Sequence, residues 1–152
     1  MSNARIDFIG SGRYGRNFNI ENDQTVIGIN GDVKLPEDDI IEYIAKYPGC
    51  DKNTVKYKMH NLFGQAVIIR EGSKFSLVDK NSLFRIYVNC VKIGNKNNNY
   101  WKSIIGDPTD SVDKLNTKND KMNSVELKSG DIISVGREVF GSSYVWIFNL
   151  KP

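Results

Sequence analysis

Histidine, cysteine and proline are scarce in this chain of 152 residues, which has one histidine, two cysteines and four prolines. The single histidine, His60, excludes sites built on a histidine pair, and no serine or carboxylate is spaced to pair with it. Cys50 and Cys90 lack metal-ligand spacing, and so low a count favours reduced thiols over a disulfide. The sequence therefore predicts no catalytic residues, no metal site and no cofactor.

Long apolar runs and dense charge runs are also lacking. No stretch approaches the roughly 20 apolar residues of a membrane-spanning helix, and none resembles a secretion signal. These absences predict an intracellular protein, nuclear or cytoplasmic, with no membrane partner. The net charge of +3 is mild and its lysines are dispersed, so nucleic-acid binding on a lysine-bearing face is the least favoured function.

Strand-like segments dominate what is present. Apolar residues make up 39% and charged residues 26%, as in a globular domain. We therefore expect a single domain over 1–152, cut from a larger protein, and the many short strands predict an all-β, two-sheet sandwich. The expected strands are Arg5–Ile9, Gln24–Ile29, Asp32–Leu35, Gln65–Arg70, Lys74–Asp79, Ile86–Asn89, Ser124–Leu127, Asp131–Val135 and Ser143–Leu150.

Two turn signals join neighbouring strands. Asn30-Gly31 favours the positive φ angles of a type I′ hairpin, and Glu71-Gly72-Ser73 marks a second hairpin. Gly10-Ser11-Gly12-Arg13-Tyr14-Gly15 fits a phosphate-binding glycine pattern, but the residues after it are poor helix formers. We therefore interpret that pattern as a glycine-rich turn.

Two insertions interrupt the strands. Pro36 starts a helix of about three turns, with Glu37, Asp38 and Asp39 facing the positive end of its dipole rather than a cation. An apolar stripe recurs at helical spacing, namely Ile40, Ile41, Ile44 and Tyr47. Its isoleucines should pack this helix, within a helical insertion over 36–61, onto the sandwich. The second insertion, 94–123, is rich in Asn, Lys, Asp and Ser and predicts a long polar loop.

The ordered motifs from Gln65 onward carry one resemblance. Gln65-Ala66-Val67-Ile68 leads to Asp79, Ser82 and Tyr87-Val88-Asn89, and Leu127-Lys128-Ser129-Gly130-Asp131 opens a last hairpin. This order, with Val26-Ile27-Gly28 upstream, resembles the forkhead-associated (FHA) domain family. The resemblance implies a two-sheet β-sandwich that reads phosphothreonine peptides with loops at one end.

Several positions depart from the family pattern at those loops. Ile29 stands at the phosphate-binding Arg, Leu62 at the phosphate-contacting Ser, Gln65 at the structural His, and Phe84 and Arg85 at the Asn-Gly pair. Ser82 matches the family, and Asn30 completes the expected partner-binding loops. Losing charge-assisted donors removes bonds of about 1.5–3 kcal/mol each.

The sequence accordingly predicts a non-catalytic interaction module that binds another protein or peptide without requiring phosphate. Phe84 is the residue expected to touch the partner. The alternative is phosphothreonine-peptide binding through non-standard basic residues, namely Arg85 with Lys56, Lys58 and Lys80.

Overall fold

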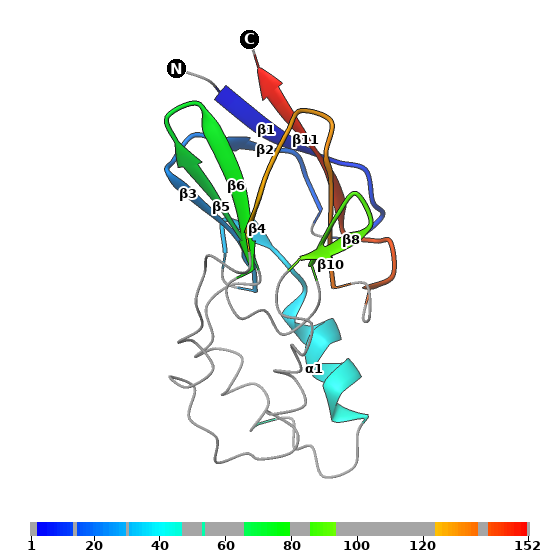
Figure 1. Cartoon of the computed structure of the whole chain (residues 1–152). Helices are drawn as coiled ribbons and strands as arrows, with labels where there is room; N and C mark the ends of the chain where they lie inside the picture. The colour runs from blue at the N-terminus through cyan, green and yellow to red at the C-terminus, as the bar shows by residue number, and fades with distance from the viewer. Residues whose placement is uncertain are drawn as a thin grey trace.

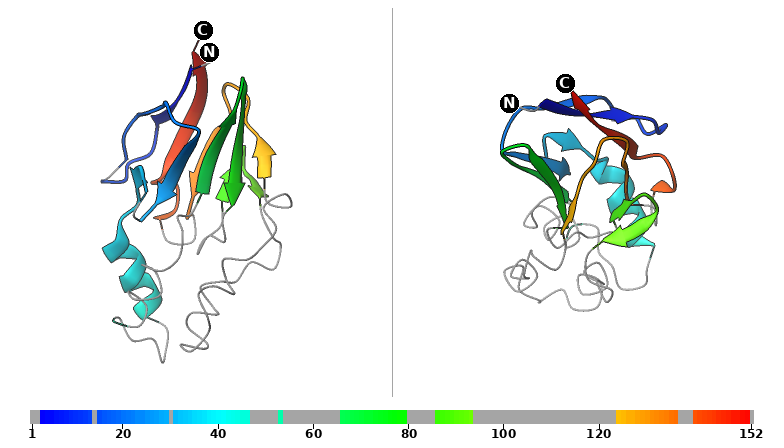
Figure 2. Two further views of the ribbon diagram at one scale, coloured as in Figure 1. Left: turned by 90° about the vertical axis from the view of Figure 1, so that its left-hand side faces the viewer. Right: turned by 45° about the horizontal axis from the view of Figure 1, so that its top comes forward.

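Two sheets packed face to face make up most of the described part of the chain, and their strands pair antiparallel in all cases but one (Figures 1 and 2). The computed structural model describes residues 3–13, 15–29, 31–46, 53, 66–79, 86–93, 124–136 and 140–151. One sheet has six strands in the order β2-β1-β11-β10-β7-β8, and the other has five in the order β4-β3-β5-β6-β9. The expected two-sheet sandwich is confirmed.

The elements follow one another along the chain as eleven strands and one helix. They are β1 (Asn3–Phe8), β2 (Phe18–Ile20), β3 (Gln24–Gly28), β4 (Val33–Lys34), α1 (Glu37–Ala45), β5 (Ala66–Glu71), β6 (Lys74–Asp79), β7 (Ile86–Val88), β8 (Val91–Ile93), β9 (Ser124–Glu126), β10 (Ile132–Val135) and β11 (Val145–Lys151). All nine expected strands are present with small shifts at their ends, whereas β2 and β8 had not been predicted.

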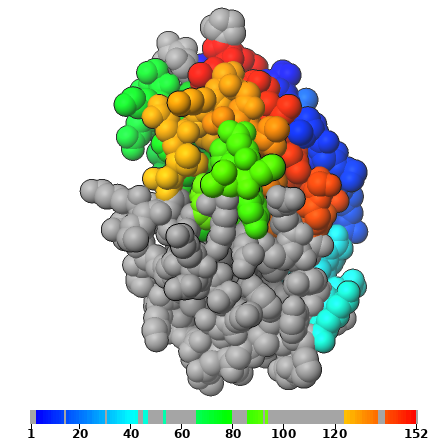
Figure 3. Space-filling view, turned by 45° about the vertical axis from the view of Figure 1, so that its right-hand side comes forward, coloured from blue at the N-terminus to red at the C-terminus, as the bar shows by residue number. Residues whose placement is uncertain are grey.

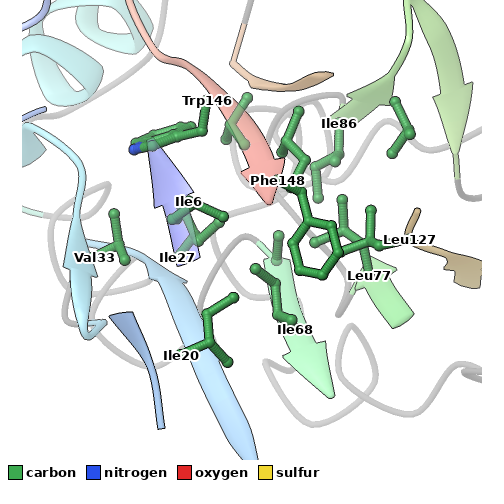
Figure 4. Packing of buried hydrophobic residues seen from close by; sticks show 14 of the residues in the cluster. Ile6, Ile20, Ile27, Val33, Ile68, Leu77, Ile86, Leu127, Trp146 and Phe148 are labelled. Carbon is green, nitrogen blue, oxygen red and sulfur yellow. The ribbon is translucent and has the colours of Figure 1, made fainter. Parts of the chain in front are cut away.

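Alternating side chains of both sheets fill the space between them (Figure 4). In β11, Trp146 and Phe148 are fully buried, and the Phe148 ring meets Phe75 of the opposite sheet at a centroid distance of 5.4 Å. Ile6 of β1 and Ile68 of β5 are equally buried. This two-residue period is what a half-buried strand requires, and it fixes the register of each strand.

The two predicted hairpins have different outcomes. Strands β5 and β6 do form a hairpin closed by Gly72-Ser73, where Gly72 has a φ of 63°. The hairpin expected at Asn30-Gly31 was wrong, because β3 and β4 pair in parallel through Ile27–Val33 and Gly28–Lys34. Gly31 is needed there for space, since an added Cβ would lie 2.5 Å from the Val26 carbonyl oxygen.

Helix α1 begins one residue after Pro36, whose carbonyl oxygen accepts the Ile40 amide at 3.4 Å. Ile40 and Ile41 are buried, although neither belongs to the core cluster between the sheets, so the packing of this helix onto the sandwich stays a prediction. The side chains of Ile44 and Tyr47 lie outside the described residues, as does the loop 94–123. No helix in the described ranges is long and apolar enough to span a membrane.

The chain ends lie together at one end of the sandwich, and α1 lies at the other (Figure 1). Asn3 pairs with Lys151 at the terminal end. At the opposite end, which we call the loop end, β3 and β6 finish and β5, β7 and β11 begin. Connections at the loop end therefore include the segments in which the sequence places its partner-binding residues.

Candidate binding surface

Ile29 is the one predicted partner-binding residue within the described ranges, and it is 8% exposed. It follows β3 directly, in a loop that closes on itself. The Gly28 carbonyl oxygen accepts the amides of Gly31 at 3.2 Å and Leu35 at 3.1 Å. The Asp32 carboxylate accepts the Val26 amide at 2.9 Å. The position expected to meet phosphate therefore holds a buried apolar side chain, and the same loop carries the Asp32 carboxylate.

The other predicted site residues lie outside the described part of the chain: Asn30, Leu62, Gln65, Ser82, Phe84 and Arg85. Their flanks are nevertheless placed. Gln65 directly precedes β5, and Arg85 directly precedes β7, and both strands start at the loop end. These six positions stay predictions.

The glycine-rich turn lies flat on aromatic rings. An added Cβ would overlap the Tyr144 ring at Gly12, the Phe8 ring at Gly15 and the Ser143 carbonyl at Gly10. The Gly12 amide donates to the Ser143 carbonyl at 3.0 Å. Strand β2 follows the turn, with no helix between them in the described residues, so a dinucleotide-binding helix is excluded there. Close packing accounts for the three glycines.

A pocket of about 430 Å³ opens beside that turn. Its lining comes from the β1–β2 loop, from α1 and the residue after it, and from the β10–β11 loop, and it includes Arg13, Asp39, Glu42, Lys46, Phe140 and Tyr144. Arg13 bridges to Asp39 at 3.3 Å, and both side chains are about half exposed. Figure 3 shows α1 (cyan) below the blue N-terminal segment and the orange-red β10–β11 segment. No sequence pattern predicts this pocket, because its lining residues are far apart along the chain.

Asp7, on β1, is the described carboxyl group with a shifted pKa. Arg5 Nε forms an ion pair with Asp7 Oδ1 at 2.8 Å, and Asn149 Nδ2 donates to Asp7 Oδ2 at 2.6 Å. The Arg5 side chain is the main cause that lowers the pKa of Asp7 from its ordinary 3.8, against an opposing effect of burial. Because an adjacent cation explains the shift, it indicates a structural ion pair.

Metal-ligand groups do not assemble in the described ranges. No three His, Cys, Asp or Glu side chains come close enough there to hold an ion. Among the acidic residues of the first turn of α1, Asp39 pairs with Arg13.

A two-sheet β-sandwich with its connecting loops gathered at one end defines the class of this domain. The chain has the fold of FHA domains, as solved structures of such domains show over 99% of its length. The kinase-interacting FHA domain of the Arabidopsis phosphatase KAPP matches with a TM-score of 0.55 and 18% identity, over 94% of that chain.

Two further structures agree. Full-length yeast Pml1p has a TM-score of 0.53 and 13% identity over 83% of its chain. An FHA domain studied for phosphothreonine-dependent interactions has a TM-score of 0.52 and 14% identity over 98% of its chain. No protein-family model and no curated protein matches the sequence. The similarity therefore establishes the fold alone, because one fold can carry many functions.

Proposed function

We propose that the chain is a non-catalytic interaction module that binds another protein or peptide without requiring a phosphate group. The FHA fold supports an interaction role, because one similar structure is an FHA domain with phosphothreonine-dependent interactions and another is a kinase-interacting FHA domain. The single observation that carries phosphate independence is the buried Ile29 at the position that resembles the family's phosphate-binding Arg.

The chemistry of the β3–β4 loop supports phosphate independence. A bound phosphate dianion needs charge-assisted donors to replace its lost water. Ile29 offers none, the Gly31 and Leu35 amides already serve Gly28, and the Asp32 carboxylate adds negative charge. A dianion placed there would lose hydration without equivalent bonds.

The shifted pKa of Asp7 is explained without a catalytic role. Asp7 has its shifted pKa on a strand and in an ion pair with Arg5, rather than in a cleft beside a second acid or base. Catalytic groups usually occupy clefts where burial and neighbouring charges tune their pKa values.

The test is a peptide library in phosphothreonine and unphosphorylated forms, titrated against the whole chain. We expect no preference for the phosphorylated form in the wild type. The matched variant Ile29→Arg restores a cation at one position and should raise phosphopeptide binding relative to Ile29→Lys. A phosphate-dependent affinity in the low micromolar range, abolished by Arg85→Ala, would overturn the proposal and establish binding through non-standard basic residues.

Phe84 is the proposed contact to the partner. For any ligand recovered from the unphosphorylated library, Phe84→Ala should weaken binding while leaving the melting temperature unchanged. Equal binding by the wild type and the Phe84→Ala variant would remove Phe84 from the interface.

A further inference from the structure

The pocket between α1 and the two loops shares no lining residue with the β3–β4 loop, so a ligand bound there goes beyond the proposed function. Three elements distant in sequence form the pocket, and its volume of about 430 Å³ falls within the roughly 300–1,000 Å³ typical of ligand sites. The chemistry of its floor and walls indicates the class of ligand.

The floor of the pocket is aromatic and rigid. Phe140 meets Tyr144 edge to face at a centroid distance of 4.7 Å. Tyr144 is only 2% exposed, and the rings of Phe8 and Trp146 stand behind it, each 6.2 Å away. Gly12 presses on the Tyr144 ring from the loop side. A floor fixed in this way needs no ordering when a ligand arrives, and aromatic faces attract cations.

The helix wall of the pocket is acidic. Helix α1 carries acidic residues in its first turn and no basic residue in its last turn. Arg13 already holds Asp39, whereas Glu42, three residues further on, is exposed and has no ion-pair partner in the described part of the chain. Lys46 follows the helix and lines the same pocket. Glu42 is thus the acceptor still open to a ligand, and Lys46 is a competing cation.

We propose that this pocket binds an arginine side chain presented by a segment of a partner protein. The planar guanidinium stacks on the partly exposed Phe140 ring, which the buried Tyr144 ring supports, and its N–H groups donate to the Glu42 carboxylate. Arginine suits such a site better than lysine, because its charge is spread over a plane that both stacks on rings and pairs with carboxylates. The lining holds two basic and two acidic side chains, and Arg13 pairs with Asp39, so the preference for a cation rests on the Glu42 carboxylate.

The test uses a defined probe, the acetylated and amidated tripeptide Gly-Arg-Gly, titrated against the labelled whole chain by NMR. The matched ligand replaces arginine by citrulline, which keeps the shape and removes the charge. We expect the amide signals of Gly12, Glu42 and Phe140 to shift with the arginine peptide. Citrulline should bind about fivefold more weakly, the loss expected for one cation at a partly exposed site.

Variants on the same helix sharpen the experiment. Glu42→Gln should weaken arginine-peptide binding about fivefold, and Lys46→Gln should strengthen it about twofold, as for a partly exposed charge. Phe140→Leu should weaken it while keeping an apolar side chain, and Asp38→Asn, outside the pocket, is the control. Equal binding of arginine and citrulline, an unchanged affinity in Glu42→Gln, or shifts confined to α1 would each overturn the proposal. Because the pocket shares no lining residue with the β3–β4 loop, failure of this probe would leave the phosphate-independent function standing.

Discussion

The Asn89 side chain clamps two turns through Asp131. Its Nδ2 donates to Asp131 Oδ1 at 2.9 Å, and its Oδ1 accepts the Ile132 amide at 2.8 Å. Asp131 Oδ2 in turn accepts the Lys128 amide at 2.7 Å. These residues, 42 positions apart, thereby join the β7–β8 turn to the turn before β10.

Asn89→Ala should lower the free energy of unfolding by about 1–3 kcal/mol, because two side-chain hydrogen bonds worth roughly 0.5–1.5 kcal/mol each are lost. The left-handed backbone at Asn89, with a φ of 51°, adds to the cost because asparagine tolerates it better than alanine. Urea denaturation measures the change. Asn19→Ala, which removes only a surface bond from Lys151, should change stability by under about 0.5 kcal/mol. Equal effects of the two substitutions would contradict the clamp.

Cys90 holds a left-handed backbone conformation, with a φ of 68°, in an exposed turn. Cys90→Gly should raise the free energy of unfolding by about 0.5–1 kcal/mol, since relief of a strain of roughly 1–2 kcal/mol exceeds the added entropy of glycine. Cys90→Ala keeps the strain and removes the thiol, so its melting temperature should match the wild type. A gain shared by both variants would assign the effect to the thiol instead.

Gly12→Ala should destabilise the domain by about 1–3 kcal/mol, the usual cost of overpacking. The new methyl group would overlap the Tyr144 ring, so the loop or the ring must move. Near-ultraviolet circular dichroism should report the disturbed aromatic cluster. The neighbouring Ser11, which is exposed, provides the control Ser11→Ala, for which no change is expected. An unchanged spectrum in Gly12→Ala would disprove this packing role.

Asp7 should make the stability depend on pH in the acid range. Its pKa in the folded chain is lowered from 3.8, mainly by Arg5, so its stabilisation is complete above 3.8 and is lost as the pH falls through the lower folded value. Asp7→Asn cannot titrate, and its stability should fall less steeply with acid below pH 3.8. Thermal melts at a series of pH values measure the two slopes. Parallel slopes would show that Asp7 gains nothing from Arg5.

Local patterns predicted most of the sandwich but failed where long-range contacts decide the geometry. The β5–β6 hairpin needed only two short runs rich in β-branched and aromatic residues with Gly72 between them, and both were visible in the sequence. Asn30-Gly31 carried an equally strong local signal, yet β4 turned to run parallel with β3. The backbone of Gly28, rather than the propensity of Asn-Gly, organises that loop through its bonds to Gly31 and Leu35.

The missed strands and the missed pocket share a cause. Strands β2 and β8 are three-residue segments that pairing with β1 and β7 holds extended, and this pairing partner is not visible in the local sequence. The pocket needs Gly12, Glu42 and Phe140 to come together from three connections, which no spacing reveals. For the partner-binding loops, the family resemblance supplied the candidates, and Ile29 is the position whose burial the structure adds.

The pairing of Asn3 with Lys151 has a practical consequence for handling the domain. Because its two ends emerge side by side and away from the loop end, a surface anchor attached at either one holds the molecule with its loops facing outward (Figure 1). Ends this close can also be joined by a short linker, with new ends opened at the exposed Gly72-Ser73 turn. Such a permuted chain would keep every strand pairing and would lose only the covalent link through the β5–β6 turn. Its attachment points would then lie on the other sheet.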